Sequence, residues 1–286
     1  MCLKNIIKIA NACINIGYWP NYFKTLTIIV ILKPNKVSYD MLKSFRPIVL
    51  LNMLSKLIEK VIGDRFQFHV ISNNFIYQSQ LRGLKFKSTA DAGIVLTHFI
   101  YMGWIKNLLT STLTFYIAQF FSSLNYYLLT LILRKADFDF YVVKLFSNYL
   151  IGRKTQYFWN NFSSLFFNVN IGVDQGLALS LIPSALYLVP FLHILENSLK
   201  NLKILVSILS FVDSGLFVAQ RKSFHFSNSL LFCSYNVVSN LLLKFELLVK
   251  YSKTKIFYFT RLHSAFNPPP LDLSSISDLI LHPKES

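Results

Sequence analysis

Asp213 is the acidic residue with the most suggestive surroundings, because turn-forming residues and two apolar runs flank it. The runs are Val206–Phe211 and Leu216–Ala219, and Val212-Asp213-Ser214-Gly215 separates them. This pattern predicts a β-hairpin with Asp213 at its tip. A carboxylate in that place can bind a hard cation such as Mg²⁺, although a lone turn aspartate is more often structural.

The cysteines and histidines predict no further metal or redox chemistry. Cys2, Cys13 and Cys233 are an odd number without a CxxC spacing, so the sequence predicts neither a disulfide framework nor a zinc site. The histidines, among them His98 and His193, lack metal-ligand spacing and are interpreted as structural. The apolar N-terminal stretch is interrupted by polar residues, so no signal peptide is expected.

Composition points to a polyanionic partner and raises one alternative. The net charge of +16 arises from 29 Lys and Arg against 13 Asp and Glu, which suits nucleic acid or an anionic membrane. Hydrophobic residues make up 53% of the chain and the mean hydropathy is +0.44, so a multi-pass membrane protein must be weighed. The best candidate span, Ala178–Leu195, contains Pro183 and Pro190 and is a poor one.

Periodicity predicts the elements that must position Asp213. Apolar runs indicate strands, and apolar residues at helical spacing indicate helices. The expected strands are Thr25–Leu32, Leu113–Ile117, Val206–Phe211, Leu216–Ala219 and Lys255–Thr260, and the expected helices are Leu54–Val70, Leu124–Leu133, Phe140–Leu150 and Val237–Leu248. Strands and helices alternate around one acidic hairpin, which predicts an α+β fold with helices backing a sheet.

A series of ordered motifs from about Ala12 to Thr260 resembles the reverse-transcriptase domain of non-LTR retrotransposons. The matching motifs are Gly17-Tyr18-Trp19-Pro20, Leu32-Lys33-Pro34-Asn35-Lys36, Ser44-Phe45-Arg46-Pro47-Ile48, Leu57-Ile58-Glu59-Lys60-Val61, Gln78-Ser79-Gln80-Leu81-Arg82-Gly83, Lys87-Ser88-Thr89-Ala90-Asp91-Ala92, Gly152-Arg153-Lys154-Thr155, Gly172-Val173-Asp174-Gln175-Gly176, Phe211-Val212-Asp213-Ser214 and Ser252-Lys253-Thr254-Lys255. Asp174 stands where the family has proline. The resemblance implies the fingers and palm of a right-hand polymerase, with an antiparallel palm sheet backed by helices and no identifiable thumb. By this resemblance, 1–105 is fingers-like, 106–262 is palm-like and 263–286 is an irregular C-terminal tail.

The resemblance also assigns the residues that stand at the family's three catalytic aspartates. Phe120-Phe121 occupies the family's Ala-Phe pair, which places Tyr116 at the first aspartate. Asp213 is the second and is retained, whereas Ser214 stands at the third. The family polymerises with two metal ions held by carboxylates, and neither a tyrosine, whose reference pKa is near 10, nor a serine replaces a carboxylate. Asp213 is the one expected metal ligand, and loss of polymerisation follows.

The remaining site residues are assigned by the same resemblance. Phe121 stands where the family packs a residue under the sugar and excludes ribonucleotides, and Gln175 and Gly176 stand near the incoming nucleotide. Lys33, Lys36 and Arg46 match basic fingers residues that approach the triphosphate or template, and Lys253 lies in the Ser-Lys-Thr motif. Taken alone, Phe121 is more often a core residue and Gln175-Gly176 a turn.

Three functions remain open at this point. The first is an inactive reverse-transcriptase (RNA-directed DNA polymerase) domain of a non-LTR retrotransposon. The second is a non-catalytic module that binds RNA or DNA, and the third is the multi-pass membrane protein. The family implies Mg²⁺ as cofactor, an RNA template and a DNA primer as partners, no membrane, and an intracellular location, nuclear or cytoplasmic. The replacements at Tyr116 and Ser214 argue against Mg²⁺ binding in this chain.

Overall fold

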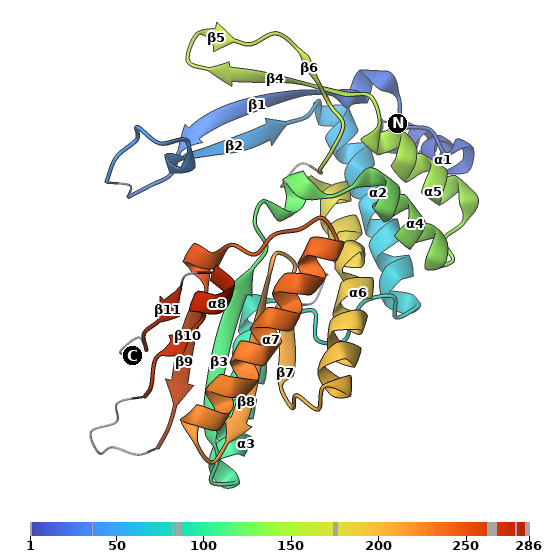
Figure 1. Ribbon diagram of the computed structural model, residues 1–286. Coiled ribbons are helices and arrows are strands. Elements are labelled where there is room, and N and C mark those ends of the chain that lie inside the picture. The colour runs from blue at the N-terminus through green and yellow to red at the C-terminus, as the bar shows by residue number, and fades with distance from the viewer. Residues whose placement is uncertain are drawn as a thin grey trace. The chain divides into compact units, whose positions relative to one another are not determined.

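The computed structural model describes residues 2–35, 37–81, 83, 87–173, 177–261, 268–277 and 279–283, and Figure 1 shows their helices and strands. The chain forms two compact units, each made of two segments. Unit 1 is Met1–Phe75 with Phe121–Tyr187, and unit 2 is Ile76–Phe120 with Leu188–Ser286. These two units are defined by their internal contacts. The regions 1–105, 106–262 and 263–286 were assigned from the resemblance instead, and their boundaries stay predictions.

Unit 1 contains a five-stranded mixed sheet. Its strands are β1 (Thr25–Leu32), β2 (Phe45–Leu50), β4 (Arg153–Trp159), β5 (Phe162–Ser163) and β6 (Phe167–Val169). The β1–β4 pairing is parallel and the others are antiparallel. The predicted strand Thr25–Leu32 is confirmed with both of its bounds. Its β-branched run favours a strand, and Pro34 has no N–H with which to continue the pairing.

Four helices accompany this sheet in unit 1. They are α1 (Cys2–Ile16), α2 (Met53–Ser72), α4 (Tyr126–Lys135) and α5 (Phe140–Leu150), and α6 (Ala178–Asn201) begins in this unit. The Asn52 side chain accepts a hydrogen bond from the Leu54 N–H and caps α2, and Asp139 caps α5 by accepting from Tyr141. The predicted helix Phe140–Leu150 is confirmed, and the predicted Leu54–Val70 and Leu124–Leu133 differ from α2 and α4 by a few residues.

Unit 2 contains a four-stranded antiparallel sheet in the order β7-β8-β3-β9. The strands are β7 (Ser207–Phe211), β8 (Ser214–Arg221), β3 (Leu109–Tyr116) and β9 (Lys255–Phe259). The predicted hairpin is confirmed as β7–β8. Ser79 and Leu81 extend the β7 edge, because the Ser79 carbonyl accepts from the Ser210 N–H at 2.9 Å and the Leu81 N–H donates to the Ser210 carbonyl at 2.8 Å.

Two helices cover this sheet, in agreement with the predicted α+β arrangement. Figure 1 shows α7 (Phe224–Lys244) in front of the sheet and α3 (Thr89–Ile105) behind it. On the α7 side, the Tyr235 and Thr254 hydroxyls hydrogen-bond at 2.9 Å. On the α3 side, Ala92 packs into a cluster with Leu209 and Val218. A capping box between Ser88 and Asp91 begins α3.

The C-terminal segment contains short regular elements where the sequence predicted an irregular tail. β10 (Leu271–Asp272) pairs antiparallel with β11 (Ile280–Leu281), and α8 (Ser274–Ser277) lies between them. Leu271, Leu273 and Leu281 are buried. Burial of these leucines explains the difference, because it stabilises strands too short to show periodicity.

Among the helices in the described part of the chain, α6 is the one long and apolar enough to cross a membrane, over Leu179–Asn201. Of its most apolar window, 67% is buried inside the protein. The core helix of a soluble protein passes the same test of length and composition, and a multi-pass protein requires several such helices. This helix is therefore weak evidence for the membrane alternative.

Candidate functional site

A two-residue turn places Asp213 at the tip of the β7–β8 hairpin. Phe211 and Ser214 are register partners, so Val212 and Asp213 form the loop between them. Val212 has a φ of 41° and its side chain is buried. Two-residue hairpin turns require a positive φ at their first position, which a β-branched residue adopts only at a cost. The strand pairing on both sides holds this conformation.

Strand β3 brings Tyr116 to the same place. Tyr116 and Ser214 are register partners in the β3–β8 pairing, so their side chains share one face of the sheet. The Ile117 N–H donates a hydrogen bond of 2.8 Å to the Asp213 carbonyl oxygen. The structure therefore brings together Tyr116, Asp213 and Ser214, which the motif alignment assigned to one site.

Lys253 joins this group through an aromatic contact. The Lys253 ammonium nitrogen lies 5.2 Å from the centroid of the Tyr116 ring, within the range of a cation–π interaction. A 3-10 turn over Tyr251–Lys253 precedes β9 and presents the lysine, and the Lys250 N–H donates to the Tyr116 carbonyl at 2.7 Å. Sequence reasoning assigned Lys253 to the site, but it gave no sign of its contact with Tyr116.

These residues do not fit a Mg²⁺ ion. Mg²⁺ requires several oxygen ligands in octahedral geometry, and Asp213 supplies the one carboxylate of the three positions. The Ser214 hydroxyl donates to the Phe211 carbonyl at 3.3 Å, and a lysine ammonium lies over the Tyr116 ring. Within the described ranges, no group of three or more His, Cys, Asp or Glu side chains is placed to hold a metal ion.

Gly215 fixes how closely β8 approaches β3 beside the site, and an added methyl group there should be destabilising. A Cβ at Gly215 would lie 2.3 Å from Cζ and 2.5 Å from Cε1 of Phe115. Phe115 is buried, so relief of the overlap has to move packed neighbours. We expect Gly215→Ala to lower the free energy of unfolding by about 1–3 kcal/mol, measured by urea denaturation.

Gly93→Ala is the matched control for that substitution. Gly93 lies within α3, and a Cβ there would meet nothing within 4 Å. The helix propensity of alanine should make this variant neutral or more stable by up to about 1 kcal/mol. Equal effects of the two substitutions would contradict the packing argument.

Phe121 and the Gly172 motif lie together within unit 1. The Phe121 carbonyl oxygen accepts from the Val173 N–H at 2.7 Å, and the Leu124 carbonyl accepts from the Gly172 N–H at 2.9 Å. Gly172 has a φ of 80°, and a Cβ there would lie 2.5 Å from the Ser122 carbonyl oxygen. The structure thus joins these two motifs, whereas Gln175 and Gly176 lie outside the described residues.

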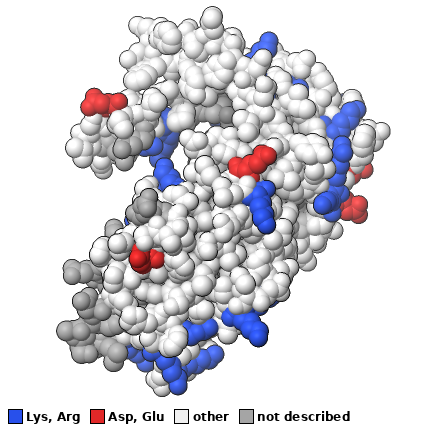
Figure 2. Space-filling view, in the orientation of Figure 1, with Lys and Arg blue, Asp and Glu red and all other residues white. Residues whose placement is uncertain are grey.

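Two of the predicted basic residues, Lys33 and Arg46, lie at the β1–β2 hairpin. Arg46 is exposed on β2 and is the register partner of Ile31 on β1. The Lys33 N–H donates to the Ser44 carbonyl at 2.9 Å, and Lys36 lies outside the described residues. On the face shown in Figure 2, Lys and Arg side chains occupy several separate places rather than one patch.

Sequence reasoning missed two oppositely charged residues buried in unit 1. Glu59 on α2 is 1% exposed and Arg153 on β4 is 2% exposed. The Arg153 guanidinium carbon lies 5.3 Å from the centroid of the Tyr149 ring. Burial raises the pKa of Tyr149 far above its ordinary value; the neighbouring Glu59 carboxylate adds to the rise and Arg153 opposes it. Arg153 and Thr155 are buried on β4 and Lys154 between them is exposed, and no feature of the sequence distinguished Arg153 from Lys154.

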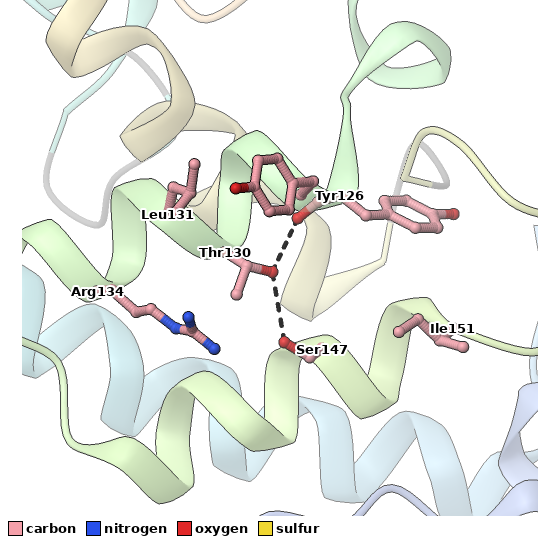
Figure 3. A pocket seen from close by; sticks show the side chains of 7 residues that line it. Tyr126, Thr130, Leu131, Arg134, Ser147 and Ile151 are labelled. Atoms are coloured by element: carbon pink, nitrogen blue, oxygen red, sulfur yellow. Dashed lines mark hydrogen bonds between the residues drawn. The ribbon is translucent and has the colours of Figure 1, made fainter.

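A pocket between α4 and α5 lies apart from these predicted residues. It has a volume of about 320 Å³ and is lined mainly by apolar atoms. Figure 3 shows the Thr130 hydroxyl donating to the Tyr126 carbonyl, at 2.8 Å, and lying 3.3 Å from the Ser147 hydroxyl. These hydroxyl groups satisfy one another, and the Arg134 side chain also lines the pocket.

Comparison with solved structures shows that the fold is similar to part of telomerase. The chain superposes on apo telomerase from Candida tropicalis with a TM-score of 0.57 and 16% identity, covering 86% of this chain and 46% of that one. The same telomerase truncated from its C-terminal domain gives a TM-score of 0.56 and 16% identity, covering 85% of this chain and 51% of that one. Candida albicans telomerase in complex with a fragment of telomeric RNA gives a TM-score of 0.56 and 13% identity, covering 87% of this chain and 44% of that one. The chain thus spans about half the length of these proteins, and at such identity the likeness concerns the fold alone.

A sequence match points toward mobile elements. Over 60 residues the chain is 40% identical to the RNA-directed DNA polymerase from mobile element jockey of Drosophila funebris. The match covers 21% of this chain and 6% of that protein. No protein-family model matches the sequence. The two comparisons confirm the resemblance to a reverse-transcriptase domain that the motifs predicted.

Proposed function

We propose that this chain is the reverse-transcriptase domain of a non-LTR retrotransposon that has lost polymerisation. One observation carries the proposal: Tyr116 and Ser214 are register partners beside Asp213, where the matched motifs require three carboxylates. In this proposal unit 2 carries the palm sheet, β1 and β2 belong to the fingers, and Mg²⁺ is not bound in the manner of an active polymerase. The location is intracellular, nuclear or cytoplasmic.

A retained ability to bind nucleic acid is the second part of the proposal. It is supported by the net charge of +16 and by the exposed Arg46 in the matched fingers motif. Two telomerases of similar fold are described in complex with an RNA fragment. The partners proposed here are an RNA template and a DNA primer, held by phosphate contacts that need no catalytic metal.

Fluorescence anisotropy with a labelled RNA–DNA template–primer at several salt concentrations tests this binding. Because each neutralised phosphate releases counterions, the affinity should fall linearly on a logarithmic scale with salt. Arg46→Gln should weaken binding, and it should reduce by about 1 the slope of the logarithm of affinity against the logarithm of salt concentration. Lys60→Gln is the control, because Lys60 lies on α2 and pairs with Asp64 at 2.6 Å. Absent binding, or binding that ignores salt, contradicts this part of the proposal.

A further inference from the structure

Gly172 and Val173, the first two residues of the Gly-Val-Asp-Gln-Gly motif, are fixed by contacts to the chain around Phe121. Two backbone hydrogen bonds, Gly172 N–H to Leu124 and Val173 N–H to Phe121, join the two segments. Gly172 adopts a φ of 80° and approaches the Ser122 backbone too closely to permit a side chain. This close approach leaves Gly172 and Val173 little freedom as long as both hydrogen bonds persist.

The Tyr126 side chain provides a third attachment. Its hydroxyl donates a hydrogen bond of 2.7 Å to the Gly172 carbonyl oxygen. Tyr126 is the first residue of α4, which Asn125 caps by accepting from the Tyr127 and Leu128 N–H groups. The hydroxyl therefore extends from a capped helix end, a more rigid support than a loop.

The buried Arg153 lies near Tyr126. Burial raises the pKa of Tyr126, and the charge of the nearby Arg153 guanidinium opposes that rise. The same guanidinium lies over the Tyr149 ring, and Glu59 is buried beside that tyrosine. Tyr126 thus connects Gly172 to the buried part of unit 1 that holds Arg153.

We propose that Tyr126 is a positioning residue that holds Gly172 and Val173 against Phe121. By doing so it keeps Gly172 and Val173 next to Phe121, which belongs to the other motif that the resemblance places at the incoming nucleotide. This inference rests on the proposed function for its consequence in binding. The positioning itself is a property of unit 1 and is measurable without any ligand.

Tyr126→Phe removes the hydroxyl alone and is the test. Amide hydrogen exchange should be faster at Gly172 and Val173 by roughly 2- to 12-fold, the range for one ordinary hydrogen bond. The Ile117 amide, which donates to Asp213 in unit 2, should not change. Tyr127→Phe is the control, since Tyr127 is 74% exposed. Unchanged exchange at Gly172 and Val173 in Tyr126→Phe overturns the proposal, as does uniformly faster exchange throughout unit 1.

Template–primer anisotropy on the same variants separates this inference from the proposed function. If the unmodified chain binds, Tyr126→Phe should weaken binding several-fold without altering the salt slope, because no phosphate contact is removed. Unchanged affinity together with faster local exchange refutes the consequence for binding and leaves the attachment intact. If the unmodified chain does not bind, the proposed function fails, and the exchange result still decides whether Tyr126 positions the segment.

Discussion

No primer extension is expected from the unmodified chain on an RNA template with either Mg²⁺ or Mn²⁺. Two of the three positions that should hold metal ions carry Tyr116 and Ser214, and a lost ligand typically costs several kcal/mol of transition-state stabilisation. With about 3 kcal/mol for each loss, the rate should fall roughly 10⁴-fold or more. A radiolabelled primer and a time course of hours provide the measurement.

The double variant Tyr116→Asp/Ser214→Asp is the informative partner of that experiment. It restores three adjacent carboxylates, so it should gain affinity for Mn²⁺ in calorimetry while the unmodified chain shows none. Ser214→Ala is the control and should not alter metal binding. Extension by the unmodified chain would refute the loss of polymerisation.

Removal of the buried charge at Arg153 should destabilise unit 1 strongly. Glu59 and Arg153 are both buried and both act on Tyr149, so Arg153→Met should leave the Glu59 carboxylate uncompensated. Loss of one member of a buried charge pair typically costs about 3–5 kcal/mol. Urea denaturation followed by circular dichroism gives the change in unfolding free energy. The exposed neighbour provides a matched control, since Lys154→Met should change stability by less than about 0.5 kcal/mol.

A double variant tests whether the loss reflects the charge of Glu59. In Glu59→Gln/Arg153→Met no full charge remains buried beside Tyr149, so stability should recover in part relative to Arg153→Met alone. Additive effects of the two substitutions would indicate that the two charges do not interact.

Local pattern and motif order predicted different parts of this protein. The β-branched run Thr25–Leu32 and the capped helix Phe140–Leu150 were predictable because their periodicity and end signals agree. The placement of Tyr116 opposite Ser214 followed from the motif order alone, because nothing local to Tyr116 indicates a site. The roles assigned to these residues stay predictions.

The missed elements have physical reasons. α3 carries apolar residues around its whole circumference, so it has no helical periodicity to detect. Pro183 and Pro190 argued against a membrane span at Ala178–Leu195, and no helix was predicted there. The helix α6 forms because burial of Leu186, Leu188 and Leu192 outweighs the cost of a proline within a helix. The positive φ of Val212 is held by the pairing of β7 with β8 and of β8 with β3, and the spacing of residues in the sequence does not reveal this conformation.

The order of strands in the unit 2 sheet has a consequence for synthesis on the ribosome. β3 lies between β8 and β9, and the contact between Thr114 and Lys255 spans 141 residues. At roughly 5–20 residues per second, β3 emerges about 7–28 s before β9 exists to pair with it. The edge of β3 that β9 covers stays open for that whole interval, and the edge that β8 covers stays open until β8 emerges. Nascent chains therefore depend on chaperones more than the finished fold does, and a stall before β9 should send them to aggregation.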